Sequence, residues 1–174
     1  MASPMKSLVV FALIATIVSG HAFAAVTHSG GAASKITVVT ETNSQSTNSG
    51  SFIDLPGATV SITVPAGKTQ LVQARFTGES GCGPISSGSY WCSVQIVAVG
   101  TSGTVQMLPD SGLDGAFDSV PGTQDLWEGH AVERSLVLPA GKYKVKAQWQ
   151  VSDPAVTFSL DDWSFTVTQY AVGK

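Results

Sequence analysis

The chain has 174 residues, a formal net charge of −3 at pH 7 and only 12% charged residues. This mildly acidic balance argues against a nucleic-acid partner, because nucleic acids bind to basic faces. The length is sufficient for one domain with a hydrophobic core of its own.

The first 24 residues have the features of a secretory signal peptide. Lys6 supplies a positive charge, an apolar run follows at Leu8–Val18, and the segment ends in Ala22-Phe23-Ala24. We predict cleavage after Ala24 and export, either out of the cell or to a periplasm or cell surface. No second long apolar segment follows, so we expect no membrane span in the mature chain.

A short linker and one domain are expected after the signal peptide. Residues 25–34 are small and polar, which is typical of a flexible linker. A first strand is expected at Lys35–Thr42, followed by a polar loop at Asn43–Ser51. The domain itself would therefore occupy residues 35–174.

Most of the remaining strands are predicted from alternation of apolar and polar residues. The clearest run is Tyr143–Val151, which places Trp149 in the core and leaves a lysine stripe on the other face. This stripe would be a solvated face that also discourages edge-to-edge pairing. It consists of Lys142, Lys144 and Lys146. Further strands are expected near residues 58–64, 72–76, 92–98, 104–108, 131–138, 156–160 and 165–167.

No window shows a sustained helical period. About eight to ten short strands in a chain of this length predict an all-β fold with little helix. We therefore expect a single antiparallel β-sandwich or jelly roll, in which two sheets pack face to face.

The tetrapeptide Pro-Ala-Gly-Lys occurs twice, at residues 65–68 and 139–142, and each copy lies between two alternating strands. Proline fixes φ and glycine accepts a positive φ, so each copy predicts the turn of a hairpin. Either the two hairpins are related and occupy equivalent places, or the same common turn is used twice. The similarity ends at the hairpin, which favours the second interpretation.

Pro109–Gln124 is expected to be a long acidic loop. It and its border contain Asp110, Asp114, Asp118 and Asp125. Calcium prefers several oxygen ligands from one flexible loop, but these residues lack the spacing of an EF-hand. A solvated loop is the favoured interpretation of the aspartates.

The two cysteines, Cys82 and Cys92, are predicted to form a disulfide, because an exported protein matures in an oxidising compartment. The nine residues between them include Gly83, Pro84 and Gly88, which allow the segment to fold back. A zinc site is the poorer alternative, because two cysteines without nearby histidines cannot complete a tetrahedral shell.

Two segments resemble known modules. Thr59–Phe76, which contains VPAGKTQLVQARF, resembles a hairpin of galactose-binding-like jelly rolls, including carbohydrate-binding modules. Val156–Val167, VTFSLDDWSFTV, is similar to their closing strands. The resemblance implies a structural calcium ion at Asp161. The wider pattern of WCSV, AFDS, WEGH and LDDW also resembles a group of secreted bacterial β-sandwich proteins.

No catalytic set is evident. After signal removal the histidines are His28 and His130, and no G-x-S-x-G elbow accompanies them. Asp161 and Asp162 are neighbours, so in a strand they would point to opposite faces and could not flank one glycosidic bond. We therefore expect a non-catalytic protein without a cofactor, apart from the calcium ion implied above.

Saccharide ligands are often bound by exposed aromatic rings. Tyr90, Trp91 and Trp127 lie at junctions between loops and strands and are the candidates for such a surface. The favoured interpretation of these aromatics is structural, in which Trp91 covers the disulfide and Trp127 covers a sandwich edge. The favoured function is a secreted binding module with a saccharide or cell-envelope partner. A self-associating structural protein that forms homo-oligomers is the first alternative, and a hydrolase is the second.

Overall fold

The structure is a computed structural model that describes residues 27–83, 89–110, 115–121 and 126–171. The predicted signal peptide, residues 1–24, lies outside the described residues. All regular structure in the described part is antiparallel β, which confirms the expected fold class. No helix there is long and apolar enough to span a bilayer. The strands are β1 (Ala33–Glu41), β2 (Gln45–Thr47), β3 (Ile53–Gly83), β4 (Ser89–Gly100), β5 (Gly103–Gln106), β6 (Ala116–Pro121), β7 (Glu128–Val151) and β8 (Thr157–Ala171).

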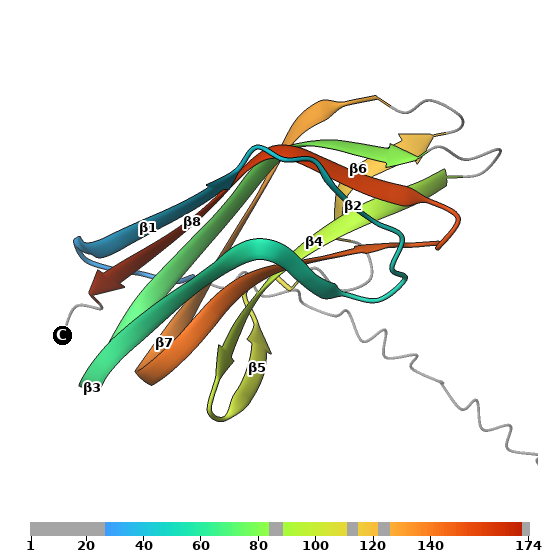
Figure 1. Ribbon diagram of the computed structural model, residues 1–174. Coiled ribbons are helices and arrows are strands. Elements are labelled where there is room, and N and C mark those ends of the chain that lie inside the picture. The colour runs from blue at the N-terminus through green and yellow to red at the C-terminus, as the bar shows by residue number, and fades with distance from the viewer. Residues whose placement is uncertain (1–26, 84–88, 111–114, 122–125, 172–174) are drawn as a thin grey trace, which may run out of the picture.

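The two longest strands, β3 and β7, each run to the same end of the molecule and return from it (Figure 1). Both reversals occur at the Pro-Ala-Gly-Lys segments, so the predicted turns are present. The predicted hairpins are wrong, because the two halves of β3 pair with the two halves of β7 and not with each other. Val64 lies opposite Gly141, and Thr69 lies opposite Pro139. Each turn is therefore an arch that carries its strand from one layer to the other.

These arches divide one continuous sheet of eight strands into two packed layers. The first layer contains β1, β2 and β8, followed by residues 70–83 of β3 and 128–139 of β7. The second layer contains residues 53–64 of β3 and 141–151 of β7, followed by β4, which pairs with β5 and β6. We call the end with the two turns the arch end and the opposite end, where β6 lies, the open end (Figure 1).

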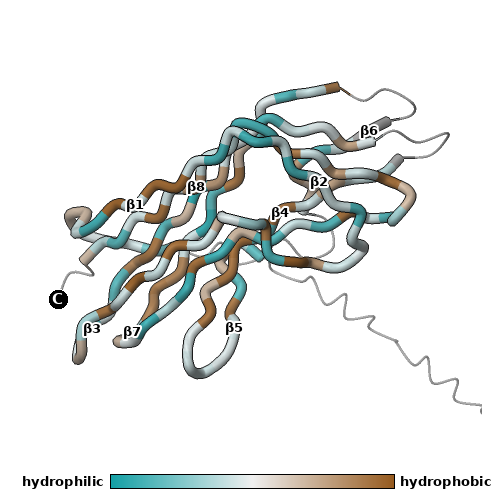
Figure 2. Tube along the Cα trace, viewed as in Figure 1, coloured by the Kyte–Doolittle hydropathy of each residue, from teal (hydrophilic) through white to brown (hydrophobic). Residues whose placement is uncertain are grey.

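The core lies between the layers, and the alternation of hydrophobic and hydrophilic residues is visible along the strands (Figure 2). Trp149 of the second layer is 2% exposed, which confirms its predicted place in the core. Its ring lies 5.7 Å from that of Phe158 on β8, in the first layer. Because this aromatic pair joins the layers, it stabilises their packing as well as burying apolar area.

Two expected loops contain strands. The short strand β2 lies within the predicted polar loop at residues 43–51, and it pairs with β8. More important for the site, β6 lies within the predicted acidic loop and pairs with the beginning of β4. Asp118 is consequently a buried residue of a strand and not a solvated loop residue. The pattern AFDSVP is too short to reveal a strand whose stability comes from its partner.

The residues before β1 cross the outer face of the first layer. The amide of Gly31 donates a hydrogen bond to the carbonyl of Ala171, at 2.6 Å. His28 Nδ1 lies 2.7 Å from Ser135 Oγ on β7. The described part of the segment expected as a linker is thus in contact with β7 and β8, and β1 begins at Ala33.

Candidate functional site

The predicted disulfide between Cys82 and Cys92 is present, with the two Cα atoms 5.9 Å apart. It joins the end of β3 in the first layer to the beginning of β4 in the second layer. Both cysteines are fully buried. The bond therefore fixes the relative position of the layers at the open end, where the candidate aromatic residues also lie.

The three candidate aromatic residues are not equivalent. Trp91 is 39% exposed and Trp127 is 50% exposed, whereas Tyr90 is half-buried and packs against the core. Neighbouring residues of a strand point to opposite faces, so Tyr90 and Trp91 on β4 cannot form one stacking surface. Trp127 immediately precedes β7 in the first layer, and its neighbour Leu126 is also exposed.

Both the backbone amide and the backbone carbonyl of Trp91 are hydrogen-bonded to Ser152. Its amide donates to Ser152 Oγ at 3.1 Å, and its carbonyl accepts from the amide of Ser152 at 2.9 Å. Because Cys92 points into the core, Trp91 points to the outer face of the second layer. Its ring is thus held on a rigid strand, which lowers the entropy cost of binding a ligand.

The same outer face continues from Trp91 with polar side chains of β4 and β7, which flank the apolar Val97 and Val99 of β4. Gln95 on β4 donates to Gln148 on β7 at 2.7 Å, and Gln148 donates to Asp54 Oδ1 at 2.8 Å. Lys146 forms an ion pair with the same carboxylate. We call this surface the Gln–Lys face. It comprises Trp91, Gln95, Lys142, Lys144, Lys146, Gln148 and Gln150.

The charge of Asp54 is stabilised by these contacts. The hydrogen bond from Lys146, followed by that from Gln148, holds the pKa of the Asp54 carboxyl below its usual range. Burial acts in the opposite direction but is the smaller effect. One of the three lysines of the stripe, Lys146, is therefore already paired with a carboxylate of the protein. No sequence pattern connects Asp54 with this stripe, because 92 positions separate it from Lys146.

A groove of about 570 Å³ lies on the second layer at its arch end. It crosses β3, β7 and β4, so the second half of β7 forms its middle. The residues used below are Ser61, Thr63, Gly100, Lys142, Tyr143 and Lys144. The alternation of Tyr143–Val151 predicted that the lysines share a face, but only the fold shows that they line a groove.

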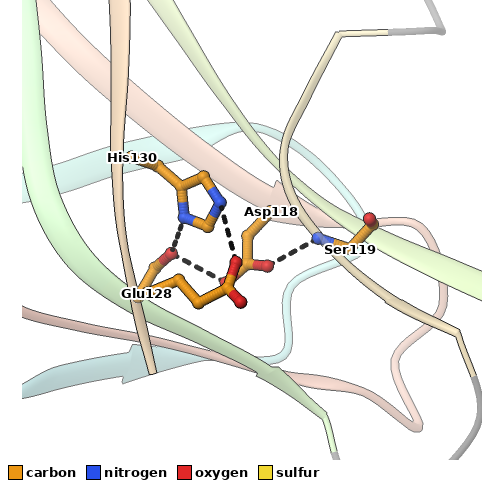
Figure 3. A network of polar contacts seen from close by, with 5 residues as sticks. Asp118, Ser119, Glu128 and His130 are labelled. Carbon is orange, nitrogen blue, oxygen red and sulfur yellow. Dashed lines mark hydrogen bonds and ion pairs between the residues drawn. The ribbon is translucent and has the colours of Figure 1, made fainter. Parts of the chain in front are cut away.

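A second polar constellation lies at the open end (Figure 3). Ser80 on β3 donates to Asp118 Oδ2 on β6 at 2.7 Å, and Ser80 Oγ lies 2.9 Å from His130 Nδ1 on β7. The amide of Ser119 donates to Asp118 Oδ1 at 2.6 Å. His130 Nε2 lies 3.7 Å from Glu128 Oε2.

These residue types are those of a serine hydrolase, but their order differs. In a catalytic triad the histidine lies between the nucleophile and the acid. Here Ser80 lies in the middle, its one proton is directed to Asp118, and its side chain is fully buried. Nδ1 of His130 must then donate to Ser80. Ser80 is therefore placed as a hydrogen-bonding link between the layers and not as a nucleophile.

Of this network, the sequence draws attention to His130 and, as a residue of the expected acidic loop, to Asp118. No sequence pattern points to Ser80. The position of Ser80 follows from the pairing of β3 with β7, which sets Ser80 opposite Glu128 and Gly78 opposite His130. This register could not be predicted, because it depends on strands that are distant in the sequence.

Asp161, the candidate calcium ligand, lies on β8 opposite Glu79. Its Oδ1 accepts a hydrogen bond from the amide of Asp162 at 2.9 Å. In the described ranges, no group of three or more histidine, cysteine, aspartate or glutamate side chains is arranged to hold a metal ion. Of the acidic-loop candidates, Asp114 and Asp125 lie outside the described residues.

Comparison with known proteins identifies remote fold similarity alone. No family model matches the chain, and no curated protein matches it either. Eiger TNF from S. frugiperda is 9% identical, with a TM-score of 0.37 over 80% of this chain and 95% of that one. Latent PorU from Porphyromonas gingivalis is 10% identical, with a TM-score of 0.38 over 83% of this chain and 14% of that one.

The VP2 subviral particle of infectious bursal disease virus is 13% identical, with a TM-score of 0.33 over 92% of this chain and 43% of that one. This chain therefore spans less than half the length of PorU and of VP2. Similarities of this size identify neither a family nor a ligand for the chain. The resemblance to galactose-binding-like modules stays a prediction.

Proposed function

We propose that this protein is an extracellular, non-catalytic binding module whose ligand is a saccharide, with Trp91 as its principal stacking surface. The observation that carries the proposal is the contrast among the tryptophans. Trp149 and Trp163 are almost completely buried, whereas Trp91 is 39% exposed on a strand that is fixed to Ser152. An indole on a rigid strand offers a flat apolar surface to the C–H groups of a sugar ring.

The neighbouring side chains supply suitable hydrogen-bonding groups. Gln150 on β7 is half-buried and lies opposite Ser93, which follows Trp91 by two positions and is itself buried. Gln95 and Gln148 come next along the strands and already bond to one another. Amide groups both donate and accept, so they match the hydroxyl groups of a sugar. Binding of this kind requires neither an acid nor a base.

Alanine substitution of Trp91 tests the proposal by retention on immobilised polysaccharides and on a glycan array. We expect Trp91→Ala to lose retention on the order of tenfold or more. The melting temperature should stay close to that of the parent, because the ring is substantially exposed. Trp127→Ala, examined in parallel, reports whether the ring at the open end contributes a second contact.

Leu126→Ala is the matched control, because Leu126 is also exposed and apolar but has no ring. It should leave retention unchanged. A parent protein that binds no glycan would refute the saccharide proposal. Unchanged retention by Trp91→Ala would show that Trp91 is not the stacking surface.

Self-association is the second candidate function, and the edge strand β1 favours it. Within the described residues, β1 pairs with β8 on one side only, and Ile36 and Val38 are exposed. An unpaired edge of nine residues can add a strand from another molecule. Antiparallel pairing of two copies centred on Val38 would set Lys35 of each copy opposite Glu41 of the other, which is a favourable cross-strand pair.

Val38→Lys tests this candidate by light scattering coupled to size exclusion. The two new charges would lie opposite one another at the centre of the pair, so a dimer of the parent should become a monomer. Val105→Lys, at an exposed position of β5, is the control and should leave the parent's mass unchanged. A monomeric parent would refute self-association through β1.

A further inference from the structure

We infer that the saccharide is an acidic polysaccharide, and that Lys142 and Lys144 bind its carboxylate or sulfate groups in the arch-end groove of the Gln–Lys face. This inference rests on the proposed function and names the ligand class. It starts from the distribution of charge. The whole chain is acidic, yet three of its nine basic residues lie at alternate positions of one strand and line one groove.

Two of these lysines are available to a ligand. Lys146 is held by Asp54. Lys142 and Lys144 are exposed, and neither forms an ion pair within the part of the chain that the structure describes. Residues two positions apart in a strand lie about 6.8 Å apart, so the like charges repel each other until an anion lies between or beside them. A multivalent anion would relieve this repulsion.

The position of the lysines removes one alternative explanation. Lysines often protect the free edge of a sheet from pairing with other molecules. Here, however, Lys144 lies opposite Ser61 on β3 and opposite Val99 on β4. The second half of β7 is therefore an interior strand at this point. Protection of an edge does not account for lysines there.

The walls of the groove can contact the hydroxyl groups of a sugar as well as its charged groups. Ser61 and Thr63 on β3 lie opposite Lys144 and Lys142, respectively, and both expose a hydroxyl beside an ammonium group. The other wall is β4, where Gly100 lies against the ring of Tyr143. A Cβ atom at position 100 would be only 2.7 Å from Tyr143 Cε1, so glycine is required for this close approach. Tyr143 alternates with the lysines and packs against the core, so the space on the lysine face is lined by cations, hydroxyl groups and the side chain of Val99.

The length of the face favours a polymer over a small sugar. Trp91 and Val99 lie eight positions apart on β4, and Val99 lies opposite Lys144. Eight residues of extended strand span about 27 Å. A ligand that contacts both the tryptophan and the lysines must therefore be an extended chain. Short acidic oligosaccharides should bind more weakly than the polymer, because they reach only one of the two ends.

The experiment compares binding of the full chain to polygalacturonate, dextran sulfate, neutral dextran and polyphosphate by affinity electrophoresis. We expect binding to one or both acidic polysaccharides, with an affinity that decreases as salt increases. The two acidic probes distinguish carboxylate from sulfate recognition. Polyphosphate tests whether the groove accepts any polyanion, and equal binding of polyphosphate would overturn the inference.

Three variants locate the site. Lys142→Gln combined with Lys144→Gln should reduce binding of the acidic polysaccharide on the order of tenfold or more. Asp54→Asn should increase binding, because it removes a negative charge and releases Lys146. Arg75→Gln is the control, since it removes one positive charge from an exposed position of β3 in the first layer and should have no comparable effect.

The outcomes separate the inference from the proposed function. If Trp91→Ala abolishes binding to a neutral polysaccharide while the lysine variant binds all probes as the parent does, the inference is wrong and the proposed function stands. If the lysine variant loses the acidic probes while Trp91→Ala keeps them, the lysine site stands and Trp91 is not the stacking surface. A parent that binds none of the polysaccharides refutes both.

Discussion

Ser80 donates a hydrogen bond to Asp118 across 2.7 Å and thereby joins β3 in the first layer to β6 in the second. The same hydroxyl lies 2.9 Å from His130 Nδ1. A buried carboxylate is costly unless hydrogen bonds replace its hydration. The serine, together with the amide of Ser119, provides those bonds to Asp118. The network is consequently a polar connection between two layers whose shared core is mainly apolar.

Ser80→Ala should lower the free energy of unfolding by about 1–3 kcal/mol, because it removes a hydrogen bond from a buried acceptor. Ser119→Ala is the control. Ser119 contributes its backbone amide to Asp118, so loss of its exposed side chain should change stability by about 0.5 kcal/mol or less. Urea unfolding of both variants measures the difference. Equal stability of Ser80→Ala and the parent would show that the hydroxyl is dispensable.

Trp149→Ala should destabilise the protein by about 3–5 kcal/mol, because it leaves a large cavity between the layers. Lys144→Ala, on the opposite face of the same strand, should stay within about 0.5 kcal/mol of the parent. Denaturant unfolding of the two variants provides the comparison. Similar losses of stability in both variants would contradict the assignment of Trp149 to the core face of β7 and of Lys144 to its outer face.

Mass spectrometry of the non-reduced protein should find Cys82 linked to Cys92. Replacement of both cysteines by alanine should cost about 2–3 kcal/mol in the chain-entropy treatment of a loop of this size. Chemical denaturation with and without reductant measures the same quantity, since the double variant should be insensitive to reductant. Free thiols in the non-reduced protein would rule out the bond.

Asp54 should make stability dependent on pH in the acidic range. Its pKa is lower in the folded protein than in the unfolded chain, so its contribution is present above the unfolded pKa and is lost as pH falls through the folded pKa. The side chain is 47% exposed, so solvent screening limits the contribution to about 1 kcal/mol or less.

Asp54→Asn is the informative variant, because asparagine keeps an acceptor for Gln148 but removes the charge. The parent should be more stable than the variant near neutral pH, and the difference should shrink as the solution is acidified. Thermal unfolding of both proteins over a series of pH values provides the measurement. A difference that does not change with pH would contradict this role of Asp54.

The sequence by itself determined which side chains enter the core. Period-two runs place successive residues on opposite faces whatever the partner strand is, so the sequence correctly predicts that Trp149 and Lys144 lie on opposite sides. The spacing and context of Cys82 and Cys92 were likewise sufficient to predict their bond. These properties are local, or depend only on the compartment, and a single sequence contains them.

Only the tertiary structure decided how the strands pair. A Pro-Ala-Gly-Lys segment reverses the chain in a hairpin and in an arch alike, because its local conformation does not depend on which strand lies beside its arms. Pairing of Val64 with Gly141 is a contact between distant segments, and its free energy comes from burying both layers together. The same long-range packing buried Asp118, left Trp91 exposed and brought Asp54 to Lys146.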